Sequence, residues 1–263
     1  MSCLRALAII TLAAFVLAPL GARAQDPAKD AGKEPAKPQA AQKTEAAKTE
    51  AAPAAPAAAS QAAGDLVPLK IELPKPMFVG TPKNIRSPNL EPQTGKARSP
   101  FMVPKGVELL SRLKPVTASD KEPIIGDTKL ITDSDKEGAD GSYVEFGPGA
   151  QWVQVDLGAV CEVYAIVMWH YHGEARVYHD VVVRTADDPD FVTNVQTIFN
   201  NDHDNSSGLG VGKDKEYIEV SEGKLIDAKG IKTRYLRFFS NGNTSNEMNH
   251  YIEIEVYGKP AAK

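Results

Sequence analysis

The chain has 263 residues and a formal net charge of −4, which suits one domain of ordinary size with extensions. Weak acidity without a clustered basic face excludes the electrostatic footprint of a nucleic-acid-binding protein. No polybasic segment adjoins an apolar helix, so attachment to anionic lipid is not indicated either.

Residues 1–24 follow the plan of a secretory signal peptide. One arginine precedes the apolar run Ala6–Leu20, and residues 22–24 form an A-x-A cleavage site. We expect cleavage before Gln25, hence a secreted or periplasmic protein with no membrane span afterwards. The run is short for a span and contains Pro19, although its retention as an anchor is an alternative.

Two segments of different composition follow. Residues 25–64 consist almost wholly of Ala, Pro, Lys, Glu, Gln and Thr, and they lack aromatic residues, Val, Ile and Leu. Such a segment cannot bury enough apolar area to offset its conformational entropy, so we predict a disordered tether. Residues 65–104 are also Pro-rich but contain apolar clusters, which predicts an extended arm lying along the main domain, with a short helical turn near residues 107–113.

From residue 105 onward the pattern indicates β-strands. Residues 152–157 alternate with period two, and residues 160–169 are more continuously apolar, as an inner strand would be. Turn-rich loops separate further short strands, and no helical period is present, which favours an antiparallel sandwich or jelly roll. The other predicted strands are 180–184, 216–220, 235–239 and 251–257.

Four motifs in this region resemble those of the discoidin family, also called coagulation factor 5/8 type C domains. They are LSRLKPVTAS at 110–119, LITD at 130–133, WVQVDLG at 152–158 and IEIEVYG at 252–258. The resemblance covers residues 105–259, followed by a tail at 260–263. It implies an all-β fold, an eight-stranded antiparallel jelly-roll β-sandwich of the galactose-binding-like type. It also implies a non-catalytic module that binds glycans, lipids or proteins through loops at one end. The chain departs from the family where Ser134 replaces the usual glycine and where Thr-x-Trp is not evident.

An acidic turn provides candidate metal ligands. Asp133, Asp135 and Asp140 supply hard oxygen atoms on a glycine-punctuated backbone, as calcium prefers. The spacing does not match the EF-hand loop. In the resembling family a structural calcium often joins this turn to a glutamate on the last strand, which adds Ser142 and Glu253 to the set. The alternative is a solvated acidic loop, and no organic cofactor is indicated.

The segment after the inner strand provides candidate ligand-binding residues. Aromatic faces pack against sugar rings while polar side chains hydrogen-bond to their hydroxyls. This predicts a platform from Trp169, His170, Tyr171, His172, Arg176 and Tyr178. Two amide-rich loops add His203, Asn205, Asn243 and Asn246, although turn chemistry alone favours the same residue types. For the aromatic residues the alternative is that they complete the core.

Together these features predict a non-catalytic secreted binding module, and recognition of carbohydrate at the cell envelope or outside it is the leading hypothesis. No catalytic residue is assigned, and the expected partner is a glycan or another cell-surface ligand. Two alternatives stay open. One is a protein-interaction or envelope-scaffolding module that works through the arm and tether. The other is a metal-dependent enzyme that uses His170 and His172, which lie two apart and project to one face of a strand.

Overall fold

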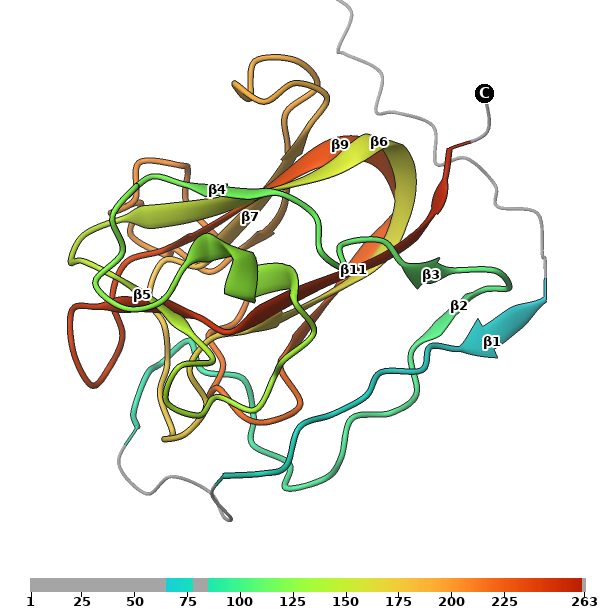
Figure 1. Ribbon diagram of the computed structural model, residues 1–263. Coiled ribbons are helices and arrows are strands. Elements are labelled where there is room, and N and C mark those ends of the chain that lie inside the picture. Colours follow the sequence, from blue (N-terminus) through green and yellow to red (C-terminus); the bar gives the residue numbers. More distant parts are fainter. Residues whose placement is uncertain (1–64, 78–84, 262–263) are drawn as a thin grey trace, which may run out of the picture. The chain divides into compact units, whose positions relative to one another are not determined.

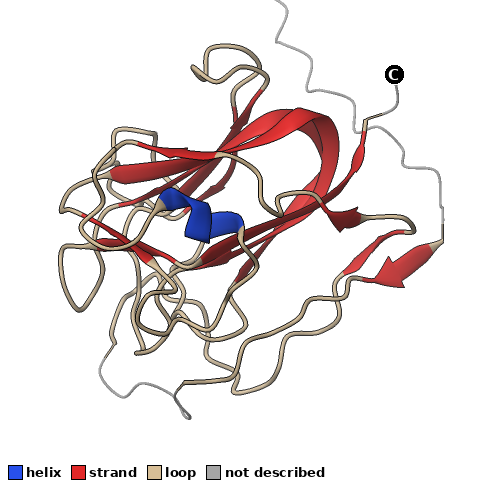
Figure 2. Ribbon diagram, in the orientation of Figure 1, coloured by secondary structure: helices blue, strands red, loops and turns tan. Residues whose placement is uncertain are grey.

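The computed structural model describes residues 65–77 and 85–261, so the predicted signal peptide and tether lie outside the described residues. The described part is all-β, with one short 3-10 helix, η1, at Thr128–Thr132 (Figure 2). The strands are β1 (Leu66–Pro68), β2 (Met102–Pro104), β3 (Glu108–Leu109), β4 (Val116–Ala118), β5 (Val144–Phe146), β6 (Gln151–Trp169), β7 (Val182–Ala186), β8 (Gln196–Asn200), β9 (Lys224–Ser240), β10 (Asn249–Tyr251) and β11 (Glu253–Pro260).

Two long strands build both layers of a β-sandwich. The first half of β6 and the second half of β9 pair within the layer β4-β6-β9-β7-β8. The second half of β6 pairs with β11 and with the first half of β9, and β3 extends this layer at the edge of β11. All these pairs are antiparallel. In Figure 1, β6 and β9 curve together from one layer into the other. This is the antiparallel sandwich that the sequence predicts.

The bend of β6 has a local cause. The register between β6 and β9 shifts between Asp156 and Cys161, so the ladder is interrupted there. Gly158 lies inside this interruption with φ at +85°, a conformation that side chains with a Cβ rarely adopt. The sequence pattern predicted two strands, 152–157 and 160–169, and the structure makes them one continuous strand with a corner.

The core lies between the two layers. Val153, Val155 and Phe238 from one layer meet Ile166 and Ile254 from the other, and none of these side chains has exposed surface. Burial of this apolar surface is the main favourable term in folding. The alternation along the first half of β6 places its apolar side chains in this core. The packed sandwich then fixes the positions of the loops at its ends.

The arm covers the outer face of the second layer. Leu69, Ile71 and Phe101 pack against a second cluster that includes Val167 and Trp169. Farther along the arm, the Arg98 guanidinium donates hydrogen bonds to the backbone carbonyls of Glu222 and Gly223, both 3.0 Å. The second half of β6 is thus buried on both faces, which explains its continuous apolar run. The domain boundaries stay predictions, and β11 continues to Pro260.

Two sequence-based assignments differ from the structure. Residues 216–220 do not form a strand, because their contacts are single ones: Glu216 bridges Leu90, and Glu219 N–H donates to Arg176 O. Residues 107–113, where a helical turn was expected, contain strand β3 instead. Among the described residues, no helix has the length and apolar character needed to cross a membrane.

Candidate functional site

Four of the predicted platform residues lie inside the protein. Trp169, His170 and His172 have no exposed surface, and Tyr178 is 1% exposed. Trp169 donates its Nε1–H to Ser221 O at 2.9 Å. A side chain without exposed surface cannot stack against an external sugar, so the prediction of a surface platform is wrong for these four. The cause is the arm and the segment before β9, which cover the end of β6.

The buried histidines have partners within the chain. His170 Nδ1 lies 2.6 Å from Glu219 Oε1, and the imidazole stacks on the Tyr178 ring at 4.2 Å between centroids. His172 Nε2 lies 2.8 Å from the backbone carbonyl of Lys136. These two rings therefore face different partners and do not converge on one metal ion, which the enzyme alternative requires.

A third histidine, His250, connects this cluster to the edge of the sandwich. Its Nδ1 lies 2.9 Å from the Tyr178 hydroxyl and its Nε2 lies 2.9 Å from Glu145 Oε2. A neutral ring satisfies both contacts, with Tyr178 O–H donating to Nδ1 and Nε2–H donating to Glu145. Burial, followed by the positive charge of Arg176, lowers the pKa of His250 to about 4. The ring is therefore neutral at physiological pH.

Tyr171, which is half-buried, and Arg176, which is only 8% exposed, lie beside this cluster. The Arg176 guanidinium lies 4.5 Å from the centroid of the Tyr171 ring, and Tyr143 contacts Tyr171 edge-on at 5.3 Å. Arg176 also pairs with Glu174 at 3.0 Å. Sequence analysis did not single out Tyr143, although its place directly after Ser142 in the acidic turn was a usable signal. These residues offer ring surface, but no pocket accompanies them among the cavities described below.

The remaining predicted residues gather at loops on one end of the sandwich, where we define the loop pocket. It has a volume of about 440 Å³ and is lined by Asn89, His179, Asp180, Asn201, His203, Asp204, Ser206, Glu216 and Asn241. These residues come from the arm and from the β6–β7, β8–β9 and β9–β10 loops. An adjoining hollow of about 360 Å³ shares His179 and Asn241 and adds Pro148, Gly149, Gly242, Asn243, Asn246 and Glu247.

Backbone hydrogen bonds hold these loops together. His179 N–H donates to Gly242 O at 3.1 Å, and Asn241 N–H donates to His179 O at 2.9 Å. Val181 N–H donates to Asn201 Oδ1 at 2.7 Å. These hydrogen bonds lie next to the strand ends and fix the walls of the pocket. Loops held on such a scaffold are suited to binding.

Two of the predicted asparagines shape turns. Asn205 lies in the left-handed region at φ 60°, and its Oδ1 accepts from Gly210 N–H at 2.6 Å. Asn243 is 6% exposed, and its Nδ2 donates to Met248 O at 2.9 Å. Asn205 does not line the pocket. Of the four loop residues in the prediction, His203, Asn243 and Asn246 lie at the pocket or its adjoining hollow.

The predicted calcium ligands lie around one end of β11. Glu253 has no exposed surface; its Oε2 accepts from Ser134 N–H at 3.0 Å, while its Oε1 is buried without a partner. Burial raises the pKa of Glu253 to about 9. Asp135 Oδ2 accepts from Ser142 Oγ at 2.7 Å, and the charge of Asp133 acts on Glu253. Asp140 is exposed, and its charge acts on Tyr143 instead.

One buried oxygen atom of this arrangement, Glu253 Oε1, lacks a compensating partner. A buried carboxylate oxygen without a donor is costly unless a cation or proton compensates it. Hydrogen bonds connect Ser134 to Glu253 and Asp135 to Ser142, but among the described residues the carboxylate oxygens of Asp133, Asp135 and Glu253 do not converge within 4.8 Å of one another. An ion here would also need backbone carbonyls of the turn as ligands. Asp140 is the member of the predicted set that is exposed and whose charge acts on Tyr143 rather than on Glu253.

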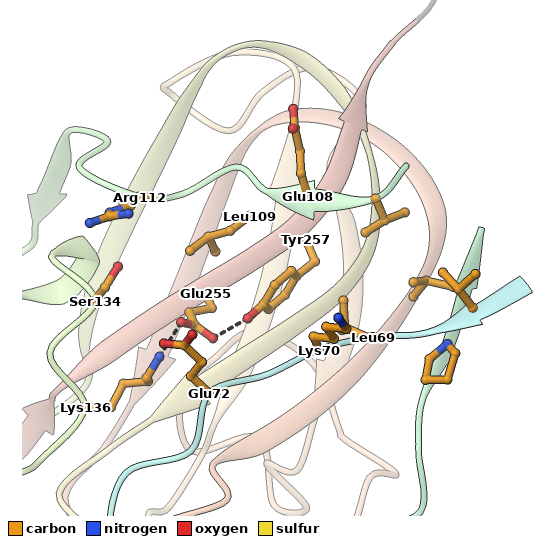
Figure 3. A pocket seen from close by; sticks show the side chains of 14 residues that line it. Leu69, Lys70, Glu72, Glu108, Leu109, Arg112, Ser134, Lys136, Glu255 and Tyr257 are labelled. Carbon is orange, nitrogen blue, oxygen red and sulfur yellow. Dashed lines mark hydrogen bonds and ion pairs between the residues drawn. The ribbon is translucent and has the colours of Figure 1, made fainter. Parts of the chain in front are cut away.

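A further cavity, which we call the arm groove, lies between the arm and the second layer and measures about 670 Å³. Apolar side chains such as Leu69 and Leu109 line part of it. At its base Lys136 Nζ pairs with Glu255 Oε1 at 2.7 Å, and the Tyr257 hydroxyl donates to Glu255 Oε2 at 2.6 Å (Figure 3). Glu255 is thus satisfied from two sides within the chain.

Comparisons with known proteins complete the description. No family model matches the chain, and no curated protein matches it in sequence. Similar solved structures include a fucose-binding module of Streptococcus pneumoniae (17% identity, TM-score 0.42, covering 59% of this chain and 99% of the module). Another is chitosan-binding module 1 from a chitosanase/glucanase of Paenibacillus sp. IK-5 (18% identity, TM-score 0.38, covering 57% and 99%). A family 89 glycoside hydrolase from Clostridium perfringens is 20% identical with a TM-score of 0.43, covering 58% of this chain but 15% of the enzyme.

Proposed function

We propose that the protein is a non-catalytic module that binds carbohydrate through the loop pocket. The observation that carries this proposal is the lining of the pocket. His179, Asn201, His203 and Asn241 bring imidazole and amide groups into one cavity, and Asp180 adds a carboxylate. Sugar hydroxyls both donate and accept hydrogen bonds, and these side chains include both donors and acceptors. The cavity is formed by loops that the strands hold in place.

The mode of binding differs from the one that the sequence predicted. Stacking on Trp169 is replaced by hydrogen bonding to hydroxyl groups in a polar cavity. The half-exposed rings of Tyr143 and Tyr171 are the aromatic surface left for a longer ligand. Each hydrogen bond contributes about 0.5–1.5 kcal/mol net, so we expect weak binding per site.

Export is part of the proposal. The signal-peptide pattern of residues 1–24 supports a secreted or periplasmic location, where envelope and extracellular glycans are accessible. The enzyme alternative based on His170 and His172 is not retained, because neither ring has exposed surface for a substrate. The scaffolding alternative rests on a different observation, the arm groove with its mixed apolar and charged lining.

We also propose that a structural calcium joins the acidic turn to the start of β11. Glu253, Asp133, Asp135 and Ser142 would hold it, and the unpartnered Glu253 Oε1 supports the assignment. The role would be to pin the turn to the sheet at a distance from the bound glycan.

A glycan array tests the proposed function with one pair of variants. Asn241→Ala and His203→Ala each remove a polar side chain from the pocket, and we expect each to weaken binding about two- to tenfold, the worth of one hydrogen bond. Gln196→Ala removes an exposed amide on β8, outside the pocket, and is the matched control.

Two results would contradict the proposal. Silence across plant, algal and bacterial glycans would favour the scaffolding alternative. Binding that Gln196→Ala weakens as much as Asn241→Ala does would place the site elsewhere.

A further inference from the structure

We infer that Asp180, Asp202 and Asp204 hold a divalent cation of the calcium type in the loop pocket, and that this cation coordinates hydroxyl oxygens of the ligand. The cation site stands on the geometry of these three residues and on an unpartnered buried amide in the same pocket. Its bridging role rests on the proposed carbohydrate binding. The site is distinct from the calcium proposed at Glu253, because its ligands come from different loops.

The first observation is the convergence of three carboxylates from two separate segments. Asp180 follows β6, whereas Asp202 and Asp204 follow β8, and one oxygen of each lies within 4.8 Å of the others. Asp202 has no exposed surface. Three like charges this close repel each other, and burial of one of them increases the cost.

The donors that contact these carboxylates are neutral. Asp180 Oδ2 accepts from Ser206 Oγ at 2.7 Å and from Asn241 Nδ2 at 2.8 Å. Asp202 accepts from the backbone N–H groups of Ser206 and Ser207 at 3.1 and 3.0 Å. Asp204 Oδ1 accepts from the backbone N–H of Ser206 at 2.9 Å. A bound cation would supply the positive charge that these donors lack.

The second, independent observation is a buried amide without a partner in the same pocket. Asn201 is 2% exposed, and its Oδ1 is occupied by Val181 N–H, while its Nδ2 has no hydrogen-bond partner. His203 Nε2, also in the lining, is buried and unpartnered as well. An amide N–H does not bind a cation; it requires an oxygen. A ligand hydroxyl, held on the cation beside it, provides that oxygen.

The spacing along the chain agrees with oxygen coordination. Asp202, Asp204 and Ser206 are two residues apart, like positions 1, 3 and 5 of the EF-hand loop. Lys213 occupies the twelfth position, where an EF-hand has a bidentate glutamate, so this is a different loop. Asp180 replaces that missing carboxylate from across the chain. Hard oxygen ligands select calcium or magnesium over transition metals, and the open cavity of about 440 Å³ leaves coordination positions for hydroxyls or water.

Calorimetric titration of calcium into chelator-treated protein tests the site without any glycan. We expect Asp204→Asn to lose one equivalent of bound calcium, or to bind it at least tenfold more weakly, relative to the unaltered protein. Asp227→Asn is the matched control, because Asp227 is also exposed and its Oδ1 also accepts from the backbone N–H two residues later. Glu253→Gln should lose the other equivalent and retain this one.

The outcomes separate this inference from the proposed function. If Asp204→Asn binds calcium as Asp227→Asn does, or if the unaltered protein binds none at millimolar concentration, the cation site is overturned. Calcium binding at Asp204 without binding to any glycan would overturn the proposed function and leave the site in place. Glycan binding that persists in chelator, with the cation removed, would overturn the bridging role alone.

Discussion

The polar residues of this protein fall into two groups that have similar compositions and opposite surroundings. The buried group, around His170, Tyr178 and His250, makes its hydrogen bonds within the chain, although His170 Nε2 is buried without a partner. The loop pocket contains His179, His203 and the same kinds of amide and acidic side chains, but its groups face a cavity. Composition therefore does not distinguish a core network from a binding site. What decides is position: a residue covered by other segments joins the core network, and a residue in the loops that line the cavity joins the binding site.

The comparison predicts that changes in the buried group act on stability, whereas changes in the pocket act on binding. The largest effect is expected for Trp169→Ala. The Trp169 indole has no exposed surface and packs against Gly223, where an added Cβ would lie 2.6 Å from the ring. Removing a buried tryptophan side chain costs about 3–5 kcal/mol of unfolding free energy.

Urea unfolding measures this cost, and His203→Ala is the pocket variant for contrast. We expect His203→Ala to change stability by about 0.5 kcal/mol or less, as surface substitutions do. If Trp169→Ala kept the stability of the unaltered protein but lost glycan binding, Trp169 would belong to the ligand site and the division into two groups would fail.

The second prediction concerns the pH dependence of the buried group. An unfolded histidine takes up its proton near pH 6.5, whereas the pKa of folded His250 is about 4. Between these values the unfolded state binds more protons, so stability falls as the pH falls. The pKa difference corresponds to roughly 3 kcal/mol lost between pH 6.5 and 4.

The His250→Gln variant isolates this contribution, because a glutamine can hydrogen-bond to Tyr178 and Glu145 but does not titrate. Denaturant unfolding at several pH values should show a shallower loss of stability for the variant below pH 6.5. If stability fell with pH equally in the two proteins, His250 would not be held neutral. The hydrogen bonding assigned to its ring, from Tyr178 and to Glu145, would then be wrong.

The sequence predicts the layers of the fold well, since period-two alternation and a continuous apolar run are direct consequences of facing one or two buried surfaces. It does not predict residues 224–233 as part of β9, because Lys229, Gly230 and Lys232 interrupt the apolar residues of this segment. Residues 216–220 have the Tyr, Ile and Val content of a strand but make only an isolated bridge at Glu216. For the site, the error at Trp169 arises from the arm, whose packing over β6 is a long-range contact. The meeting of Asp180 with Asp202 likewise depends on how β7 and β8 place their flanking loops.

The smallest effect is expected at Glu253, which is buried but lies at the acidic turn, outside the group around His170, Tyr178 and His250. A ligand that binds only the folded state stabilises it by about 2.7 kcal/mol at 100 times its Kd. We therefore expect calcium to raise the melting temperature of chelator-treated protein, and Glu253→Gln to lose this part of the rise. In chelator, the variant should be about as stable as the unaltered protein, because the pKa of Glu253, raised to about 9 by burial, already keeps this side chain neutral and glutamine has the same shape. Asp204→Asn should retain the Glu253 contribution. An equal rise for Glu253→Gln and the unaltered protein would leave Glu253 a protonated core residue, and the only calcium bound would then be the one in the loop pocket.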